Sequence, residues 1–323
     1  MSTTPQTTGG RAGALAERLK ATVGRAHRLG DLISSSSYRR ALWCRTLCRA
    51  LARTNPDLRL VGITRGKEIT FLLLRDSVIT PYTLTSDGFQ RDELDRVLRW
   101  CRKIGSPLGG VFVDVGANMG TTTLMALRTG QFSGAICIEP GPDNVELIAM
   151  NMAVNGLGER VRVVAAAVSG ENTTSRLYLA EENSGDHQIG PSSDGSAGRR
   201  TAIEVETKTL DAVLAAVQES PARVSCVWVD TQGCEGLVLR GAPDLIAAGA
   251  PFCIEFWPHG CRRVGCYEDL LHTVETRFDG FVDLGEPDPA PVRHPSTIRD
   301  FARRFDGSTE HTDLFLIPSG KGI

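Results

Sequence analysis

The segment VFVDVGANMG, residues 111–120, decides how the fold of this chain is interpreted. Its first half is apolar and β-branched, which is typical of a buried strand. Gly116, Asn118 and Gly120 then predict a sharp turn that leads into a helix at Thr121. In open parallel sheets, ligands bind beyond the carboxyl ends of the strands. A strand, a glycine-containing turn and a helix in this order therefore indicate a candidate nucleotide pocket.

After this segment, apolar runs of helical period alternate with short β-rich runs. They predict a helix over 121–130, a strand over 135–139, a helix over 142–154 and a strand over 161–168. The alternation resumes with a helix over 209–218, a strand over 224–230, a helix over 235–241 and a strand over 252–257. Such a pattern is typical of a parallel, doubly wound sheet with helices on both faces.

Residues 170–223 interrupt this alternation. They contain two strand-like runs, Ser175–Ala180 and Ala202–Thr207, joined by the connector ENSGDHQIGPSSDGSAGRR. The connector is rich in Gly and Ser and is too long for a simple hairpin turn. We therefore expect residues 170–208 to form an insertion that includes a mobile loop or lid.

The C-terminal part completes the predicted sheet. It is expected to contain a helix over 267–277, a strand over 280–284, a short helix over 296–305 and a strand over 312–318. The last helix and loop are too short to require a parallel crossover, so the final strand can pair antiparallel with its predecessor. The predicted fold class is α/β, with a Rossmann-like seven-stranded sheet and an antiparallel last strand.

The N-terminal third is predicted to form an extension. Residues 1–37 would comprise a disordered start and an amphipathic helix from Leu15. Residues 38–105 would add a helix over 38–53, a hairpin over 58–74 and a helix over 92–104. The first two helices could pack on the main domain of residues 106–323, form a homodimer contact or cap the site.

Charge is unevenly distributed along the chain. The net charge of the 323 residues is −2, which gives no reason to expect a nucleic-acid partner. Residues 1–50 carry nine Lys/Arg and two Asp/Glu, which leaves 27 basic and 36 acidic residues in the remainder. This basic arm could contact an acidic partner, a membrane surface or the acidic body, and a solvated helix face is the simplest interpretation.

The cysteine pattern and hydropathy suggest a cytoplasmic protein. Nine cysteines in a chain of this length do not form a disulfide framework, and several lie inside apolar runs. Their spacing predicts no zinc site. We also expect no transmembrane segment and no secretion signal, since no apolar run has the necessary length.

Six ordered motifs between about residues 75 and 257 resemble the FkbM family of S-adenosylmethionine-dependent methyltransferases. They are VDVGANMG, IEPGPDN, NMAVNG, AAVS, VDTQGCEGLVLRGA and IEFWP. The resemblance implies a class I methyltransferase domain over 106–323, with S-adenosyl-L-methionine as cofactor. It also implies a small-molecule acceptor, because the family mostly modifies sugars and secondary metabolites.

The residues of the first motifs suit such a cofactor. Gly116 and Gly120 let the backbone approach the methionine end, and Asp114 can serve the α-ammonium directly or through water. Glu139 follows the second strand, where a carboxylate can accept hydrogen bonds from both ribose hydroxyls. By resemblance, the cofactor site also includes Asn118, Asn144, Asn155 and Ala167. From spacing alone, the asparagines at 144 and 155 are equally well explained as helix caps or core residues.

Two candidates for catalysis lie later in the chain. Asp230 ends a strand, and His187 lies in the insertion, in the family-like run NSGDHQI. Either could remove a proton from an acceptor hydroxyl, although an exposed loop histidine is more often only solvated. Gln232 stands where the family usually has Glu, which weakens any carboxylate metal cage, so no metal is predicted. Gln188, Glu255 and Trp257 are candidates for binding the acceptor.

The sequence therefore predicts a methyltransferase of EC class 2.1.1 that acts on oxygen, with a role in natural product biosynthesis. Two alternatives stay open. One is another Rossmann-like enzyme such as a nicotinamide dehydrogenase, although the segment lacks G-x-G-x-x-G spacing. The other is a non-catalytic binding module that keeps the methyltransferase fold.

Overall fold

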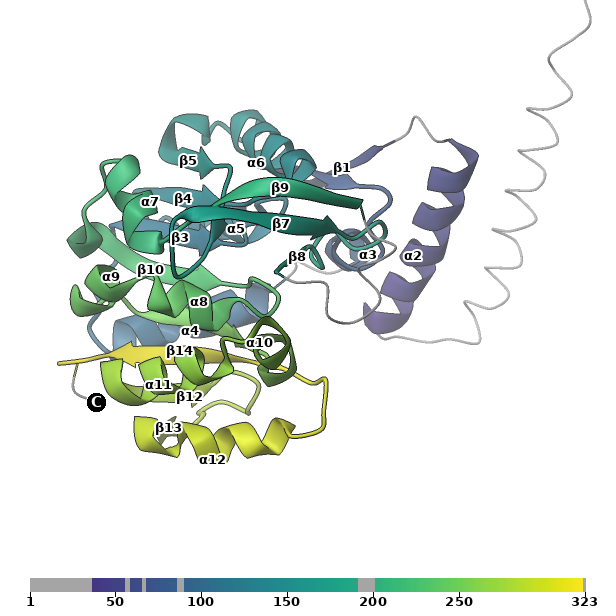
Figure 1. The fold of residues 1–323 in the computed structure, drawn as a ribbon. Helices are drawn as coiled ribbons and strands as arrows, with labels where there is room; N and C mark the ends of the chain where they lie inside the picture. The colour runs from purple at the N-terminus through teal and green to yellow at the C-terminus, as the bar shows by residue number, and fades with distance from the viewer. Residues whose placement is uncertain (1–36, 56–58, 66–67, 86–89, 191–200, 322–323) are drawn as a thin grey trace, which may run out of the picture.

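The structure is a computed structural model that describes residues 37–55, 59–65, 68–85, 90–190 and 201–321. A main α/β domain carries a smaller N-terminal extension at one side (Figure 1). The predicted disordered start and the amphipathic helix from Leu15 lie outside the described residues. So do parts of the hairpin turn and of the connector.

An eight-stranded sheet forms the centre of the main domain, in the order β13-β12-β14-β11-β10-β3-β4-β5. Strands β5, β4, β3, β10 and β11 are mutually parallel, whereas β14 runs antiparallel to both β11 and β12. The strands are β3 (Val111–Val115), β4 (Gly134–Ile138), β5 (Val161–Val164), β10 (Val224–Val229), β11 (Phe252–Phe256), β12 (Phe278–Asp283), β13 (Val292–Arg293) and β14 (Thr312–Pro318).

This topology confirms the predicted fold class. Seven strands form the expected Rossmann-like sheet, and its last strand in sequence is antiparallel. The additional strand β13 has only two residues, too few to produce a recognisable period in the sequence.

Helices cover both faces of the sheet because β3 alternates its side chains between two cores. Val111, Val113 and Val115 pack into one core with residues of α7, α8, α9, α11 and α12. Phe112 packs into the other core with residues of α4, α5 and α6. These helices are α4 (Arg91–Lys103), α5 (Thr121–Arg128), α6 (Pro142–Val154), α7 (Leu210–Ala216), α8 (Glu235–Arg240), α9 (Pro243–Ala247), α11 (Tyr267–Arg277) and α12 (Ile298–Ala302).

The predicted insertion contributes to a second sheet with the order β6-β9-β7-β8. Its longest pair is antiparallel, with Thr173 opposite Thr207 and Leu179 opposite Thr201. Figure 1 shows β7 and β9 running together across the main sheet. The four strands are β6 (Ala167–Val168), β7 (Thr173–Leu179), β8 (Gln188–Ile189) and β9 (Thr201–Lys208).

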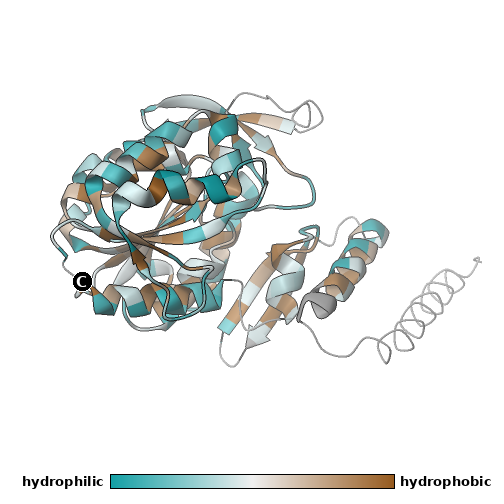
Figure 2. Cartoon of the chain, turned by 90° about the horizontal axis from the view of Figure 1, so that it is seen from below, coloured by the Kyte–Doolittle hydropathy of each residue, from teal (hydrophilic) through white to brown (hydrophobic). Residues whose placement is uncertain are grey.

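The extension consists of α2, a two-stranded sheet and the short helix α3, and Figure 2 shows it beside the main domain. Its elements are α2 (Ser37–Thr54), β1 (Leu60–Arg65), β2 (Glu68–Leu73) and α3 (Ile79–Thr85). Helix α3 is not apparent in the sequence, which has Pro81 inside it. It is fixed instead by buried Asp76, whose Oδ1 accepts hydrogen bonds from three backbone N–H groups, those of residues 78, 79 and 80.

Two asparagines of α6 attach this extension to the main domain. Asn151 Oδ1 accepts from Phe71 N at 2.7 Å, and its Nδ2 donates to Phe71 O at 3.1 Å. Asn155 makes the same pair of bonds with Ile69, at 3.0 and 2.6 Å. One helical turn spans about 5.4 Å, close to the repeat of two strand residues, so the two amides act as a substitute strand for the open edge of β2.

This arrangement corrects the prediction that Asn155 binds the cofactor. Asn155 follows the last turn of α6, whereas the first turn of that helix lies at the cavity described below. A helix of this length spans about 20 Å, so the side chain is far from the carboxyl ends of the strands. The residue attaches β2, and the helix-end interpretation of its spacing is correct.

We predict that Asn155→Ala lowers the free energy of unfolding by about 1–3 kcal/mol, because both backbone groups of Ile69 lose their partner. Val154→Ala, at an exposed neighbouring position, should change it by less than about 0.5 kcal/mol. Urea unfolding measures both values. If Asn155→Ala kept full stability and instead weakened S-adenosylhomocysteine binding, this structural role would be wrong.

Within the described residues, no helix combines the length and the apolar character needed to cross a bilayer.

Candidate functional site

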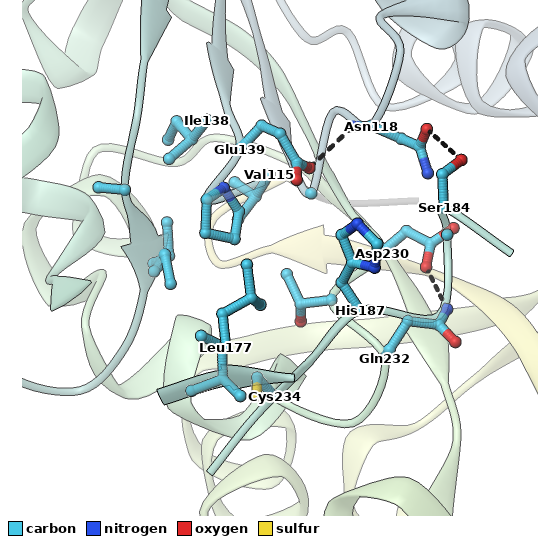
Figure 3. A pocket seen from close by; sticks show the side chains of 18 residues that line it. Val115, Asn118, Ile138, Glu139, Leu177, Ser184, His187, Asp230, Gln232 and Cys234 are labelled. Carbon is cyan, nitrogen blue, oxygen red and sulfur yellow. Dashed lines mark hydrogen bonds between the residues drawn. The ribbon is translucent and has the colours of Figure 1, made fainter. Parts of the chain in front are cut away.

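A cavity that opens to solvent lies at the carboxyl ends of β3, β4 and β10; together with the solvent space at its mouth it comprises about 510 Å³. The loop between β7 and β8, residues 180–187, lines one side of it and is called the cover below. Figure 3 shows Glu139, His187 and Asp230 around the same space. Its wall consists of Val115, Gly116, Asn118, Ile138, Glu139, Pro140, Ala166, Ala167, Val168, Leu177, Ser184, Gly185, His187, Ile189, Asp230, Thr231, Gln232 and Cys234.

Gly116 allows the ends of β3 and β10 to approach closely. Its φ is +81°, and a Cβ at this position would lie 1.9 Å from the carbonyl oxygen of Asp230. Asp230 N also donates to Val115 O at 3.0 Å, directly before the turn. Only glycine permits both this conformation and this contact, so the turn and Asp230 form one wall of the cavity.

Glu139 joins the segments that surround the cavity. Its Oε2 accepts from Asn118 N at 3.0 Å, and its Oε1 accepts from Gly141 N at 2.8 Å and from Asn144 Nδ2 at 3.2 Å. Burial raises the pKa of Glu139 to about 6, although these donors oppose the shift. A carboxylate oxygen offers two lone-pair directions, so Glu139 keeps acceptor capacity toward the cavity.

Asp114 lies under the turn rather than in the cavity wall. It is buried on the same side of β3 as Phe112, and its Oδ2 accepts from Thr123 Oγ1 of α5 at 2.6 Å. Burial raises its pKa to about 7. Any contact with a cofactor ammonium would therefore run through water, the second of the two routes that the sequence leaves open.

The remaining predicted cofactor residues have different positions. Ala167 lies in the cavity wall between Ala166 and Val168. Gly120, with φ +77°, begins α5 and packs against Met152 and Ile148. Asn144 is outside the wall, because its Nδ2 supports Glu139 from behind and also donates to Ser184 O at 3.4 Å.

Asp230 faces the cavity and bonds to two side-chain amides. Gln232 Nε2 donates to its Oδ1 at 2.7 Å, and Gln90 Nε2 donates to its Oδ2 at 3.2 Å. Gln90 is held in turn by Thr122, whose hydroxyl donates to its Oε1 at 3.1 Å. Burial raises the pKa of Asp230, while the two amides oppose the shift. The sequence analysis missed Gln90, since nothing in its local pattern indicates a contact with a residue 140 positions away.

His187 lies on the Glu139 side of the cavity. Its Nδ1 accepts from Ala180 N at 3.1 Å, and a Cβ on Gly141 would lie 3.1 Å from its Cδ2. Because Nδ1 is used as an acceptor, the neutral ring carries its proton on Nε2. The two predicted catalytic residues line the same cavity and approach it from different elements, Asp230 from the end of β10 and His187 from the loop before β8.

The segment around Ser184 holds the cover in place. Asp76 Oδ2 accepts from both the backbone N and the hydroxyl of Ser184, each at 2.7 Å. The same hydroxyl is 3.3 Å from Asn118 Oδ1, and Glu182 pairs with Arg49 of α2. The N-terminal extension is thus connected to the cover and, through it, to the turn after β3.

The predicted acceptor residues lie outside the cavity wall. Gln188 turns away from it and donates to Asp186 Oδ1 at 2.8 Å. Trp257 Nε1 donates to the Thr309 carbonyl oxygen at 3.0 Å, so this side chain packs at the start of β14. Glu255 is buried next to the wall, where its Oε2 accepts from Gln232 Nε2 at 3.2 Å.

His311 is a neighbour of this site that the sequence analysis missed. Its Nε2 is 3.7 Å from Glu255 Oε1, because β14 begins beside the end of β11. Strand pairing between distant segments produces this contact, and only the predicted antiparallel last strand could have suggested it.

The cavity fits an adenosyl cofactor with a polar tail. Apolar side chains can hold a flat base, Glu139 can accept hydroxyl hydrogens, and Asp230 marks the polar end; the apolar residues are Ile138, Ala166, Ala167, Val168, Leu177 and Ile189. Among the residues that the structure describes, no three His, Cys, Asp or Glu side chains are grouped to hold a metal ion.

Residues 114–262 match the family model of the methyltransferase FkbM domain. This segment contains the turn after β3, Glu139, His187 and Asp230, and the match confirms the resemblance seen in the sequence motifs. No curated protein matches the chain significantly.

Several solved structures resemble the chain. The methyltransferase FkbM from Methylobacillus flagellatus KT has 15% identity and a TM-score of 0.39 over 64% of this chain and 43% of that protein. The chain therefore spans less than half the length of that relative. TYW2 from M. jannaschii, in complex with AdoMet, has 11% identity and a TM-score of 0.39 over 80% and 85%. An RNA methyltransferase from Salinibacter ruber, in complex with S-adenosyl-L-homocysteine, has 13% identity and a TM-score of 0.33 over 71% and 92%.

We predict that Glu139→Ala weakens S-adenosylhomocysteine binding at least about tenfold, since hydrogen bonds to a charged group contribute about 1.5–3 kcal/mol each. Glu146→Ala, on the exposed side of the same α6, should leave the affinity unchanged. Isothermal titration calorimetry measures both. Equal affinities of the two variants would contradict the assignment of the ribose site to Glu139.

Proposed function

We propose that this chain, whose residues 114–262 form a methyltransferase FkbM domain, transfers a methyl group from S-adenosyl-L-methionine to a hydroxyl oxygen of a small molecule. The acceptor class is a sugar or a secondary metabolite, and the process is natural product biosynthesis in the cytoplasm. The methyltransferase domain of residues 106–323 would perform this reaction with help from the 38–105 extension. The 170–208 insertion would cover the site.

The cofactor would lie along the cavity wall. Glu139 would accept hydrogen bonds from the ribose hydroxyls, and the apolar side chains around Ala167 would hold the adenine. The turn at Gly116 would approach the methionine end, with buried Asp114 acting through water. His187, beside Gly141, would close the ribose side of the site.

When bound, this cofactor supplies an electrophilic methyl group on a positively charged sulfur. The protein then has two tasks, which are to align the acceptor oxygen and to remove its proton. Alignment of two reactants can supply about 7–11 kcal/mol of a barrier, and a general base adds about 10²–10⁴-fold in rate. The attachment of Ser184 to Asp76 and Asn118 supports the first task, because it fixes one side of the cavity in which the two reactants would meet.

Asp230 is the proposed base, and its position carries the proposal. It is a carboxylate in the cavity wall, at the end of the strand next to β3. Its pKa is raised by burial, which brings a carboxylate closer to the value that suits a base near neutral pH. As the acceptor oxygen forms its bond to the methyl carbon, its proton would pass to Asp230, and the electron pair of the broken C–S bond would stay on sulfur.

The proposed partner is the small-molecule acceptor. A homodimer through the N-terminal helices is a further proposal, supported by exposed Leu42, Trp43 and Leu47 on α2.

We predict that Asp230→Asn lowers kcat at least about a hundredfold, since an amide cannot accept the proton. S-adenosylhomocysteine affinity should stay within about threefold of wild type, because the amide preserves the volume of the side chain. Asp143→Asn, an exposed acid at the start of α6, is the control and should keep full activity.

The assay transfers a radiolabelled methyl group to a panel of hydroxylated sugars and aromatic natural products, followed by kinetics with the acceptor that is found. Full turnover by Asp230→Asn would exclude it as the base. Cofactor binding without transfer to any acceptor would support a non-catalytic module, and nicotinamide binding would support a dehydrogenase.

A further inference from the structure

Half-buried Asp230 and buried Glu255 are carboxylates that share one amide donor. Gln232 Nε2 lies 2.7 Å from Asp230 Oδ1 and 3.2 Å from Glu255 Oε2. The two acids end the neighbouring parallel strands β10 and β11. Two like charges that share a site with little solvent cannot both ionise without a large electrostatic cost.

The donors around this pair are unequal. Asp230 receives a side-chain N–H at each oxygen, one from Gln232 and one from Gln90. Glu255 receives the longer bond from Gln232, and the basic group nearest to its other oxygen is His311 at 3.7 Å. Hydrogen bonds from N–H donors stabilise the ionised form of a carboxyl group. The geometry therefore favours Asp230 as the ionised member of the pair.

The charges that face Glu255 act in the same direction. Burial raises its pKa most, and the charges of Asp230 from β10 and Glu235 from α8 add to the shift; Asp313 from β14 adds to it only when it is ionised. His311 is 59% exposed on its side chain, so solvent screens its effect. Asp313 is half-buried, and desolvation raises its pKa to about 8. Asp230 has fewer opposing influences, because the hydrogen bonds from Gln232 and Gln90 both favour its charged form.

We propose that Glu255 is a positioning residue that holds a proton at neutral pH, so that Asp230 alone carries the negative charge of the pair. The proposal rests on the function proposed above, in which Asp230 is the base. The neutral neighbour leaves the Gln232 amide directed at Asp230, and this keeps the base ionised and correctly oriented. Gln232 and Gln90 are then the two residues that orient the base.

If Glu255 is protonated, Glu255→Gln should have a smaller effect than the same substitution at an ionised active-site acid. An amide reproduces the size and neutrality of a protonated carboxyl group, so the variant tests whether the neighbour of Asp230 is neutral in the wild-type protein. The acid limb of the pH–rate profile reports the ionisation of Asp230. It should shift by less than about 0.3 pH unit, because the neighbour is neutral in both proteins. An ionised Glu255 would instead raise the pKa of Asp230. Removing that charge would move the acid limb of the profile to lower pH by about 1 unit or more.

Infrared spectroscopy tests the proton on Glu255 without any acceptor. The difference spectrum of wild type minus Glu255→Gln, recorded near neutral pH, should contain the carbonyl band of a protonated carboxyl group. Wild type minus Glu146→Gln, which removes an exposed acid, should contain only ionised carboxylate bands. A carboxylate signal for Glu255 would overturn the proposal even if the enzyme were fully active.

The two proposals fail in different ways. If wild type binds S-adenosylhomocysteine but methylates no hydroxyl, the proposed function is wrong, and the catalytic role of Glu255 is wrong with it. If wild type is active and Glu255→Gln loses more than about a hundredfold in kcat or shifts the acid limb by about 1 unit, only the proposed role of Glu255 is wrong.

Discussion

The carboxylate of Glu139 is the interaction on which the arrangement of this site depends. It bonds to the backbone of the turn after β3, to the backbone at the start of α6 and to Asn144. Those bonds join the turn after β3 to the start of α6, just beyond the last paired residues of β3 and β4. The turn then holds Asn118 against Ser184, and Ser184 is bound to Asp76 of the extension. A single buried acid thus connects the cofactor wall, the cover and the N-terminal extension.

Several acids with raised pKa values lie close together in the same part of the molecule. Burial raises the pKa of six acids around the carboxyl ends of the strands: Asp114, Glu139, Asp230, Glu235, Glu255 and Asp313. For Asp114 and Asp313, the folded-state values of about 7 and about 8 exceed the ordinary 3.8. At pH values between 3.8 and these folded-state pKa values, the folded state therefore binds more protons than the unfolded state. The contribution of both groups to the free energy of unfolding decreases as pH rises through this range. Strongly perturbed acids in a cavity are typical of functional sites, which is consistent with catalysis at this end of the sheet.

The sequence predicts most of the fold, because hydrophobic period and glycine turns are local signals. The buried strand before Gly116 and the helix over Tyr267–Arg277 follow directly from such patterns. Predictions of where a site residue lies are correct where one segment determines its position, as for Glu139, which follows β4 directly and lines the cavity. They fail where tertiary contacts decide: Asn155 attaches β2, and Gln90 and His311 reach the site from distant segments. No local pattern contains the information for these contacts, since strand order and loop placement bring the partners together.

The central claim is that the cavity beyond β3 binds an adenosyl methyl donor. Equilibrium binding of S-adenosyl-L-methionine and of NADH to the full chain, compared in the same titration, tests it most directly. One S-adenosyl-L-methionine should bind per chain with saturation, and NADH should not bind at the same concentrations. Binding of NADH, or of neither ligand, would contradict it.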